Sequence, residues 1–272
     1  MWSLFIPASA NDVESLSTRL WEMGTVGIVE ETEGLRAFFE DDVERAAVCA
    51  QFELPETKAR QEEALTTLEA APLACDPILI GKRFFVAPSG VKESAPAGRF
   101  RLTIDATSAF GSGRHESTQM CIEALERYLQ RSQVVLDVGC GSGILAAAAQ
   151  LLGAGAVFSC DIHEESVQTA KALIETPLFV GSADGVRSHA ADIVVANISA
   201  KILDVIARDL QRTTRPSGLI VLGGFIQEKP PKCFRPREIL TKGDWQCWLC
   251  GPQDVSPADI SGESVAHCRQ WW

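Results

Sequence analysis

Residues 137–143 read Asp-Val-Gly-Cys-Gly-Ser-Gly, the most informative stretch of this chain. It follows the apolar segment 134–136 and precedes an alanine-rich stretch from Ile144 to Leu152. An apolar run, a glycine loop and a helical pattern make the strand, turn and helix with which α/β proteins bind nucleotide-containing cofactors. Glycine adopts positive φ and lets a ligand approach the backbone, while the start of the helix offers unpaired N–H donors.

The spacing of the glycines leaves three interpretations open. Gly139, Gly141 and Gly143 follow Asp137 in a D-x-G-x-G-x-G pattern, which resembles the first motif of S-adenosyl-L-methionine (SAM) methyltransferases. The stretch 141–146 also matches the G-x-G-x-x-A pattern of NAD-type dinucleotide oxidoreductases, formally and weakly. A tight turn without a ligand is the third interpretation.

A second element narrows the choice of cofactor. Residues 110–118 read Phe-Gly-Ser-Gly-Arg-His-Glu-Ser-Thr and precede an amphipathic helical pattern. Alone, this is a glycine turn followed by Ser/Thr helix-capping chemistry. Together with the glycine loop it resembles the F-G-[TS]-G-x-H-x-[ST]-T element of the bacterial ribosomal protein L11 methyltransferases, the PrmA family. Ser112 stands where threonine is commoner in that family.

The resemblance extends to later stretches in the order of the family. The strand-like segment 156–161 ends in an acid, and residues 192–198 are similar to a family strand that ends in Val-Val-Ala-Asn. Residues 216–224 resemble the turn and strand that follow, and Gly243-Asp244-Trp245 is similar to a late Gly-Glu-Trp. The match covers roughly residues 78 to 250. The proline-interrupted stretch 225–243 is shorter than in the family, which usually carries a longer helix there.

The N-terminal third predicts a small α+β domain. Strand, helix, strand, strand, helix is the order of a ferredoxin-like unit. The pattern places these elements at 2–7, 11–23, 25–30, 35–39 and 42–52. A further helix is expected over 55–71, then a strand over 78–87 and a Pro/Gly linker over 88–98.

From residue 132 onward, apolar strands alternate with helical patterns, as in a doubly wound, mostly parallel sheet. We expect strands at 133–138, 156–161, 178–181, 191–196 and 218–223 and a final hairpin of 234–240 with 244–250. Helices are expected near 143–152, 164–174 and 200–212. Ligands of such sheets bind beyond the carboxyl ends of the strands, where the glycine loop, Asp161 and Asn197 all fall.

The expected domain organisation combines these patterns with the resemblance. It has a small substrate-recognition domain at 1–75, a strand and Pro/Gly linker at 76–108, a seven-stranded Rossmann-like SAM methyltransferase domain at 109–251, and a tail at 252–272. The implied activity is SAM-dependent methylation of lysine ε-amines, an N-terminal α-amine, or both, on a large-subunit ribosomal protein. A methyltransferase for another protein or for a small molecule is the alternative.

Each cofactor-binding residue has a functional and a structural interpretation. Gly139, Gly141 and Gly143 are expected to let the backbone approach the methionine and ribose of SAM. Asp161 is expected to accept hydrogen bonds from the ribose hydroxyls, or else to cap the following helix. Asp137 serves the amino group of the cofactor, or fixes the loop by accepting backbone N–H bonds.

Three further residues are assigned to cofactor contact or to catalysis. The resemblance aligns Thr118 with a cofactor-contacting threonine, with helix capping as the alternative. Asn197 is expected beside the cofactor, where its amide positions the accepting amine; the alternative is a strand-end turn residue. His115 is the candidate general base, although a lone histidine beside a glycine turn more often orders the loop.

Composition limits the partners. The net charge is −11, and residues 1–100 hold nine Lys and Arg against seventeen Asp and Glu. Such a chain binds polyanions poorly and attracts a basic protein, unless the acids serve only solubility. We therefore expect no nucleic-acid partner, and a monomer. No segment has the length and apolarity of a transmembrane helix or the pattern of a signal peptide.

The cysteines favour a reducing compartment. Nine cysteines without framework spacing indicate free thiols and a cytoplasmic protein. Cys247 and Cys250 resemble half of a zinc site, but the only late partners, Cys233, His267 and Cys268, are irregularly spaced. We expect no metal.

Overall fold

The computed structural model describes residues 2–8, 16, 19–20, 23–25, 27–31, 34–39, 41, 43–61, 76–104 and 113–256. The chain divides into two compact units, Met1–Ala71 and Pro72–Trp272. Each is described by itself below.

The smaller unit contains a four-stranded antiparallel sheet in the order β2-β3-β1-β4. Its elements are β1 (Trp2–Pro7), β2 (Gly27–Glu31), β3 (Gly34–Phe39), α2 (Arg45–Gln51) and β4 (Ala59–Gln61). This strand order is that of a ferredoxin-like unit, and β1, β2, β3 and α2 lie close to their predicted positions. The expected helix over 55–71 is wrong at residues 56–61, which form a single 3-10 turn and then β4. Most of the helix expected over 11–23, and residues 62–75, lie outside the described residues.

The core of this unit explains its strand pairing. Trp2 of β1 lies opposite Phe39 of β3, and their rings stack with centroids 4.5 Å apart. Leu4 and Leu35 are fully buried beside them, and Val48 packs into the same cluster from α2. Alternate residues of β1 and β3 therefore supply one apolar face, on which α2 lies.

The larger unit begins with a three-stranded sheet, where a single strand and a linker were expected. It consists of β5 (Ile78–Ile80), β6 (Phe84–Pro88) and β7 (Phe100–Ile104). Phe84, Val86 and Leu102 are buried in the same core as the helices of this unit. The Glu126 carboxylate accepts hydrogen bonds from the backbone N–H groups of Lys82 and Arg83 at 3.0–3.2 Å. Residues 78–104 are therefore an integral part of the larger unit.

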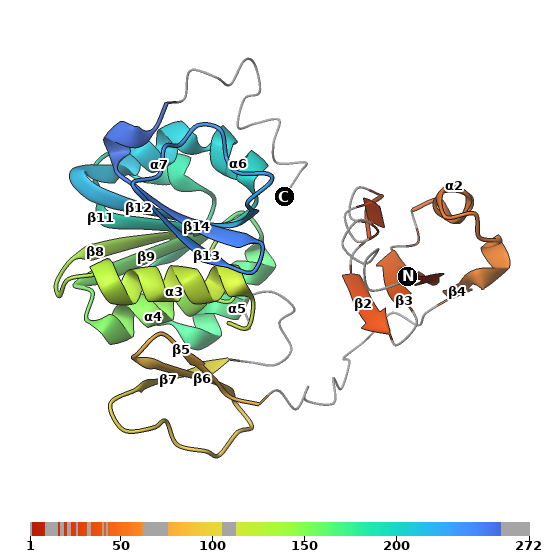
Figure 1. Cartoon of the computed structure of the whole chain (residues 1–272), viewed down its shortest axis with the longest axis horizontal. Helices are drawn as coiled ribbons and strands as arrows, with labels where there is room; N and C mark the ends of the chain where they lie inside the picture. The colour runs from red at the N-terminus through yellow and green to blue at the C-terminus, as the bar shows by residue number, and fades with distance from the viewer. Residues whose placement is uncertain are drawn as a thin grey trace. The chain divides into compact units, whose positions relative to one another are not determined.

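The main sheet has seven strands in the order β10-β9-β8-β11-β12-β14-β13, with β14 antiparallel to its neighbours and β8 to β12 parallel. Helices α3 to α5 lie on one face and α6 and α7 on the other (Figure 1). The predicted doubly wound, Rossmann-like fold is confirmed. The elements are α3 (Glu116–Tyr128), β8 (Val134–Val138), α4 (Ile144–Leu152), β9 (Ala156–Asp161), α5 (Glu164–Leu173), β10 (Leu178–Val180), β11 (Ala191–Asn197), α6 (Ala200–Val205), α7 (Ala207–Thr213), β12 (Thr214–Ile226), β13 (Glu238–Lys242) and β14 (Trp245–Cys250).

The central strands form where the sequence carries apolar runs. β8 and β11 are covered on both faces, so their residues are almost continuously buried, as in parallel sheets. α4 begins after Gly143 (φ 81°) and ends at Gly153 (φ 95°), which is the left-handed conformation that glycine adopts without strain. The helix expected over 200–212 is split into α6 and α7 at Ile206. No helix occupies residues 227–237, all of which are described.

Candidate active site

The glycine loop between β8 and α4 is fixed to the end of β9. Gly139, Gly141 and Gly143 all have positive φ, at 73°, 52° and 81°. The N–H groups of Gly139 and Cys140 both donate to the carbonyl oxygen of Cys160, at 2.8 and 3.1 Å. A Cβ added at Gly143 would lie 3.1 Å from the Cβ of Ala170, so this glycine lets α5 pack closely. A Cβ added at Gly141 would meet no atom within 4 Å, so the loop faces open space there.

Asp161 is the acid that holds the turn beside this loop. Its Oδ2 accepts a hydrogen bond from the N–H of Gly141 and its Oδ1 accepts one from the N–H of His163, each at 3.0 Å. The side chain is buried. Each carboxylate oxygen has a second lone pair, so the carboxylate orders the turn and can still accept hydroxyl donors from a ligand.

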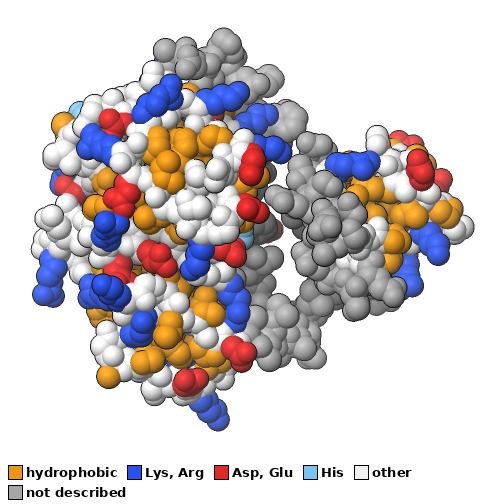
Figure 2. Space-filling model, in the orientation of Figure 1, with side chains coloured by type: hydrophobic (Ala, Val, Ile, Leu, Met, Phe, Trp, Pro, Cys, Tyr) orange, Lys and Arg blue, Asp and Glu red, His pale blue; other side chains and the backbone are white. Residues whose placement is uncertain are grey.

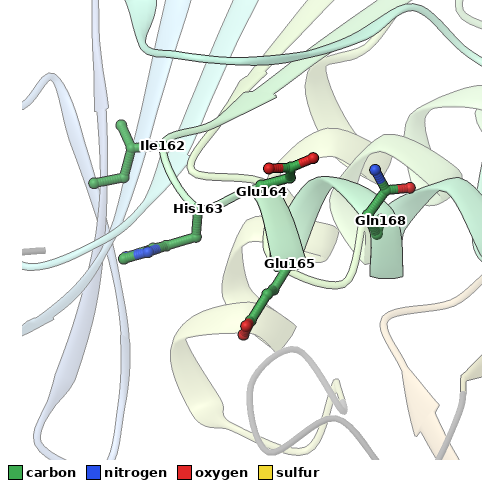
Figure 3. A pocket seen from close by; sticks show the side chains of 5 residues that line it. All are labelled: Ile162, His163, Glu164, Glu165 and Gln168. Atoms are coloured by element: carbon green, nitrogen blue, oxygen red, sulfur yellow. The ribbon is translucent and has the colours of Figure 1, made fainter.

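An open pocket follows directly after Asp161 (Figure 3). Ile162 and His163 line it from the turn, and Glu164, Glu165 and Gln168 line it from α5. Ile162 is only partly buried and offers an apolar surface to a flat ring. Sequence reasoning missed this pocket. The sequence feature that could have revealed it is an apolar residue, Ile162, directly after the acid that ends a predicted strand.

The carboxyl end of β10 also lies beside Asp161. The N–H of Gly181, just after β10, donates to the carbonyl oxygen of Asp161 at 2.8 Å. Ser182 follows, and its buried hydroxyl finds no hydrogen-bond partner among the residues that the structure describes. The turn after β10 was not singled out from the sequence, because no motif marks it.

Asp137 lies beneath the glycine loop and is fully buried. Its Oδ2 accepts a hydrogen bond from the N–H of Ala146 at 3.2 Å, while Oδ1 has no partner in the described part of the chain. Burial raises the pKa of Asp137 to about 7. A buried carboxylate oxygen without a donor is costly, and a cationic or N–H donor from a ligand would relieve that cost.

Asn197, at the end of β11, meets Thr118, in the first turn of α3. The Asn197 Nδ2 donates to the Thr118 Oγ1 at 3.0 Å, which joins residues 79 positions apart. The Asn197 Oδ1 is buried and receives no hydrogen bond from any of the described residues. The structure therefore brings these two predicted residues together and leaves one amide oxygen unsatisfied.

His115 caps the helix that carries Thr118. Its Nδ1 accepts a hydrogen bond from the N–H of Ser117 at 3.2 Å, and its ring lies edge-on against Trp245, with centroids 4.2 Å apart. Partial burial lowers the pKa of His115, so the neutral ring is favoured. With Nδ1 as acceptor, the neutral ring carries its proton on Nε2. This geometry favours the loop-ordering role over the general base. Phe110, Gly111 and Ser112 lie outside the described residues.

The described residues contain neither a cluster of metal ligands nor a helix that could span a membrane. Over the described ranges, no three His, Cys, Asp or Glu side chains gather as a metal site would need, and Cys247 and Cys250 are buried. In the same part of the chain, no helix has both the length and the apolar character needed to cross a membrane.

Comparison with known proteins gives the family. The model of the family described as "Ribosomal protein L11 methyltransferase (PrmA)" matches residues 69–249, two thirds of the chain. The chain belongs to the PrmA family. The resemblance seen in the sequence is thereby confirmed. The smaller unit lies almost entirely outside the matched residues.

Curated relatives agree with this assignment. A ribosomal protein L11 methyltransferase of Dechloromonas aromatica is 38% identical over 183 residues, which are 63% of this chain and 61% of that protein. One from Nitratiruptor is 35% identical over 200 residues, covering 70% of this chain and 69% of that protein. The PrmA relatives from Dechloromonas aromatica and Clostridium botulinum are thus matched over about 60% of their own length.

A solved structure supports the fold. The ribosomal protein L11 methylase of Lactobacillus delbrueckii subsp. bulgaricus superposes with a TM-score of 0.58 at 26% identity. The match covers 64% of this chain and 95% of that one.

Proposed function

We propose that this PrmA-family chain is a SAM-dependent methyltransferase. Its acceptors are lysine ε-amines, an N-terminal α-amine, or both, on ribosomal protein L11. The observation that carries the proposal is the carboxyl edge of the parallel strands β9, β8 and β11, where Asp161, the glycine loop and Asn197 all lie. Glycine backbone, a carboxylate and an unsatisfied amide oxygen converge there, as binding a nucleoside cofactor and an amine requires.

The cofactor side of the site, defined as Gly139–Gly143, Asp137 and Asp161, fits SAM. Gly141 faces open space where a ligand can approach the backbone. Asp161 has lone pairs left for the two ribose hydroxyls, and the pocket at Ile162 has the apolar surface that an adenine ring needs. The unpartnered Oδ1 of Asp137 suits the α-amino group of the cofactor, directly or through water.

The acceptor side, defined as Thr118 and Asn197, would place the accepting amine. SAM would supply a methyl group bonded to its sulfonium sulfur. A neutral amine would attack the methyl carbon in line with the C–S bond that breaks. At neutral pH, a lysine amine costs about 4 kcal/mol to deprotonate, and a nearby positive charge and a dry site lower that cost. Holding the amine N–H groups and aiming its lone pair is then the main contribution of the protein. The Oδ1 of Asn197, buried and without a donor, supports this role.

Charge supports a basic protein substrate. Residues 1–71 carry five Lys and Arg against fifteen Asp and Glu, so the smaller unit has a net charge of −10. The larger unit carries twenty Lys and Arg against twenty-one Asp and Glu. On the face of it that Figure 2 shows, positive and negative side chains are interspersed. A concentrated negative charge attracts basic proteins such as those of the ribosome and repels nucleic acid. We assign substrate recognition to the smaller unit and the cytoplasm as the place of action.

Methyl transfer to purified ribosomal protein L11 tests the proposal. Incubation with SAM and the enzyme is expected to raise the mass of the substrate by whole methyl groups. Peptide mapping would then locate these groups on lysines or on the N-terminus. An enzyme that binds S-adenosylhomocysteine (SAH) but leaves ribosomal protein L11 unmodified would instead act on another protein or on a small molecule.

A further inference from the structure

The amide of Asn197 is packed between Gly223 and Cys121. Gly223 of β12 is the register partner of Asn197 on β11. A Cβ added at Gly223 would lie 2.7 Å from the Asn197 Oδ1 and 2.7 Å from the Cys121 Sγ. Cys121 is on α3, one turn after Thr118, which accepts the hydrogen bond from the other end of the same amide.

These contacts hold the side-chain amide of Asn197 in one position. A carbon 2.7 Å from oxygen or sulfur is well inside van der Waals contact, since optimal separations are about 3.5–4.0 Å. Cys121 has no free space to retreat into, because it is fully buried and its Sγ lies 3.9 Å from the Cys247 Sγ. An alanine at 223 must therefore displace the amide, the thiol or the strand.

We infer that Gly223 and Cys121 are positioning residues for methyl transfer. They act through Asn197: Gly223 leaves the space that the amide occupies, and Cys121 closes that space from the α3 side. The inference rests on the proposed function, because it assigns the two residues to the orientation of the accepting amine.

The effect is confined to the acceptor side. The glycine loop and Asp161 belong to β8 and β9, on the other side of β11 from Gly223. Gly223→Ala is thus expected to lower kcat about 10- to 100-fold, since small misplacements of a reacting group cost this much. The affinity for SAH and the KM for ribosomal protein L11 should stay within about twofold of wild type.

A second substitution makes the test specific. Cys121→Ala removes one of the three nearest atoms that an added Cβ would meet within 4 Å, and the vacated space lets that Cβ shift away from the amide. Gly223→Ala/Cys121→Ala is therefore expected to recover most of the lost kcat. Cys121→Ala alone, which opens the α3 side without displacing the amide, should lower kcat less than Gly223→Ala does. Gly90→Ala is the matched control, because a Cβ there meets nothing within 4 Å and its φ is ordinary. A glycine needed only for folding would instead lower the stoichiometry of SAH binding together with kcat, because less of the protein would be folded.

The amide can also be observed directly. The chain has only two asparagines, Asn11 and Asn197, so labelling asparagine with ¹⁵N gives two side-chain amide signals, assigned with Asn197→Ala. Gly223→Ala should shift the Asn197 signal and leave that of Asn11 in place, and the double variant should return it toward wild type. This readout needs neither SAM nor substrate.

The possible failures are distinguishable. If wild type neither binds SAH nor transfers methyl groups, the proposed function fails, and the amide signals still decide whether Gly223 and Cys121 hold Asn197. The inference is overturned if Gly223→Ala has wild-type kcat and an unshifted amide. It is equally overturned if the affinity for SAH falls in step with kcat, or if adding Cys121→Ala to Gly223→Ala does not raise kcat.

Discussion

The two sides of the candidate site are held by different kinds of contact. On the cofactor side, backbone N–H groups donate to a carbonyl or a carboxylate between β8, β9 and the turns that follow them. On the acceptor side, side chains from α3, β11 and β12 pack and hydrogen-bond with one another. The first arrangement follows from local strand–turn–helix sequence, while the second exists only once distant segments have packed. Substitutions on the cofactor side should therefore change binding, and those on the acceptor side should change rate.

The largest effect is expected on stability, at Asp137. With its pKa raised to about 7 in the folded protein and near 3.9 when unfolded, the folded state binds the extra proton between these values. Stability should thus fall as pH rises from about 4 to 7. Asp137→Asn removes this fall and should stabilise the ligand-free protein at pH 8 by up to about 4 kcal/mol, with little gain near pH 4. Urea unfolding across this pH range measures the difference.

The control for Asp137 is an exposed acid of the same unit. Glu175→Gln should leave the pH dependence unchanged. Bound SAH should reduce the advantage of Asp137→Asn, because an amino group beside Oδ1 stabilises the charged carboxylate. A variant as sensitive to pH as wild type would show that Asp137 is ionised in the folded protein.

Asn197→Ala should have the next largest effect, on the rate alone. Loss of the positioning amide is expected to lower kcat about 100-fold and to leave SAH affinity nearly unchanged. Single-turnover transfer to ribosomal protein L11 measures the chemical step. Thr118→Ser is the matched control, since it keeps the hydroxyl that accepts from Asn197. Parallel losses of rate and cofactor affinity in Asn197→Ala would erase the division between the two sides.

Asp161→Ala should have the opposite signature. It removes the proposed ribose acceptor and the partner of the Gly141 and His163 N–H groups. Cofactor affinity should fall roughly 10- to 100-fold, equivalent to about 1.5–3 kcal/mol. The KM for SAM is the measurement, and exposed Glu175→Ala is the control. An unchanged KM would leave Asp161 only its structural role in the turn.

The smallest effect is expected at His115. Loss of the helix cap in His115→Ala should cost about 1 kcal/mol of stability, whereas His115→Asn, with a capping side chain, should keep most of it. Denaturant unfolding measures both. If His115 only orders the loop, His115→Asn also keeps the pH–rate profile of wild type. If His115→Asn instead lacks a titration that the wild-type profile shows, His115 acts as the general base.

The same contrast decides what the sequence can predict. The segment 156–161 forms β9 as expected, and the loop at Gly139 adopts the expected positive φ, because both depend on residues close in the chain. The three-stranded sheet was not predicted, because it depends on packing against α3, and β4 was read as helix because its three residues form a strand only by pairing with β1. The roles of Gly223 and Cys121 were also missed, since no local pattern marks a glycine that must leave room for a side chain on the next strand.

Calorimetric titration of the wild-type protein with SAH tests the central claim most directly, with Asn197→Ala titrated alongside. The account predicts micromolar binding by wild type that Asn197→Ala retains. NAD, titrated under the same conditions, should give no heat of binding. Folded protein that binds NAD but not SAH would contradict the account and return the glycine loop to dinucleotide chemistry.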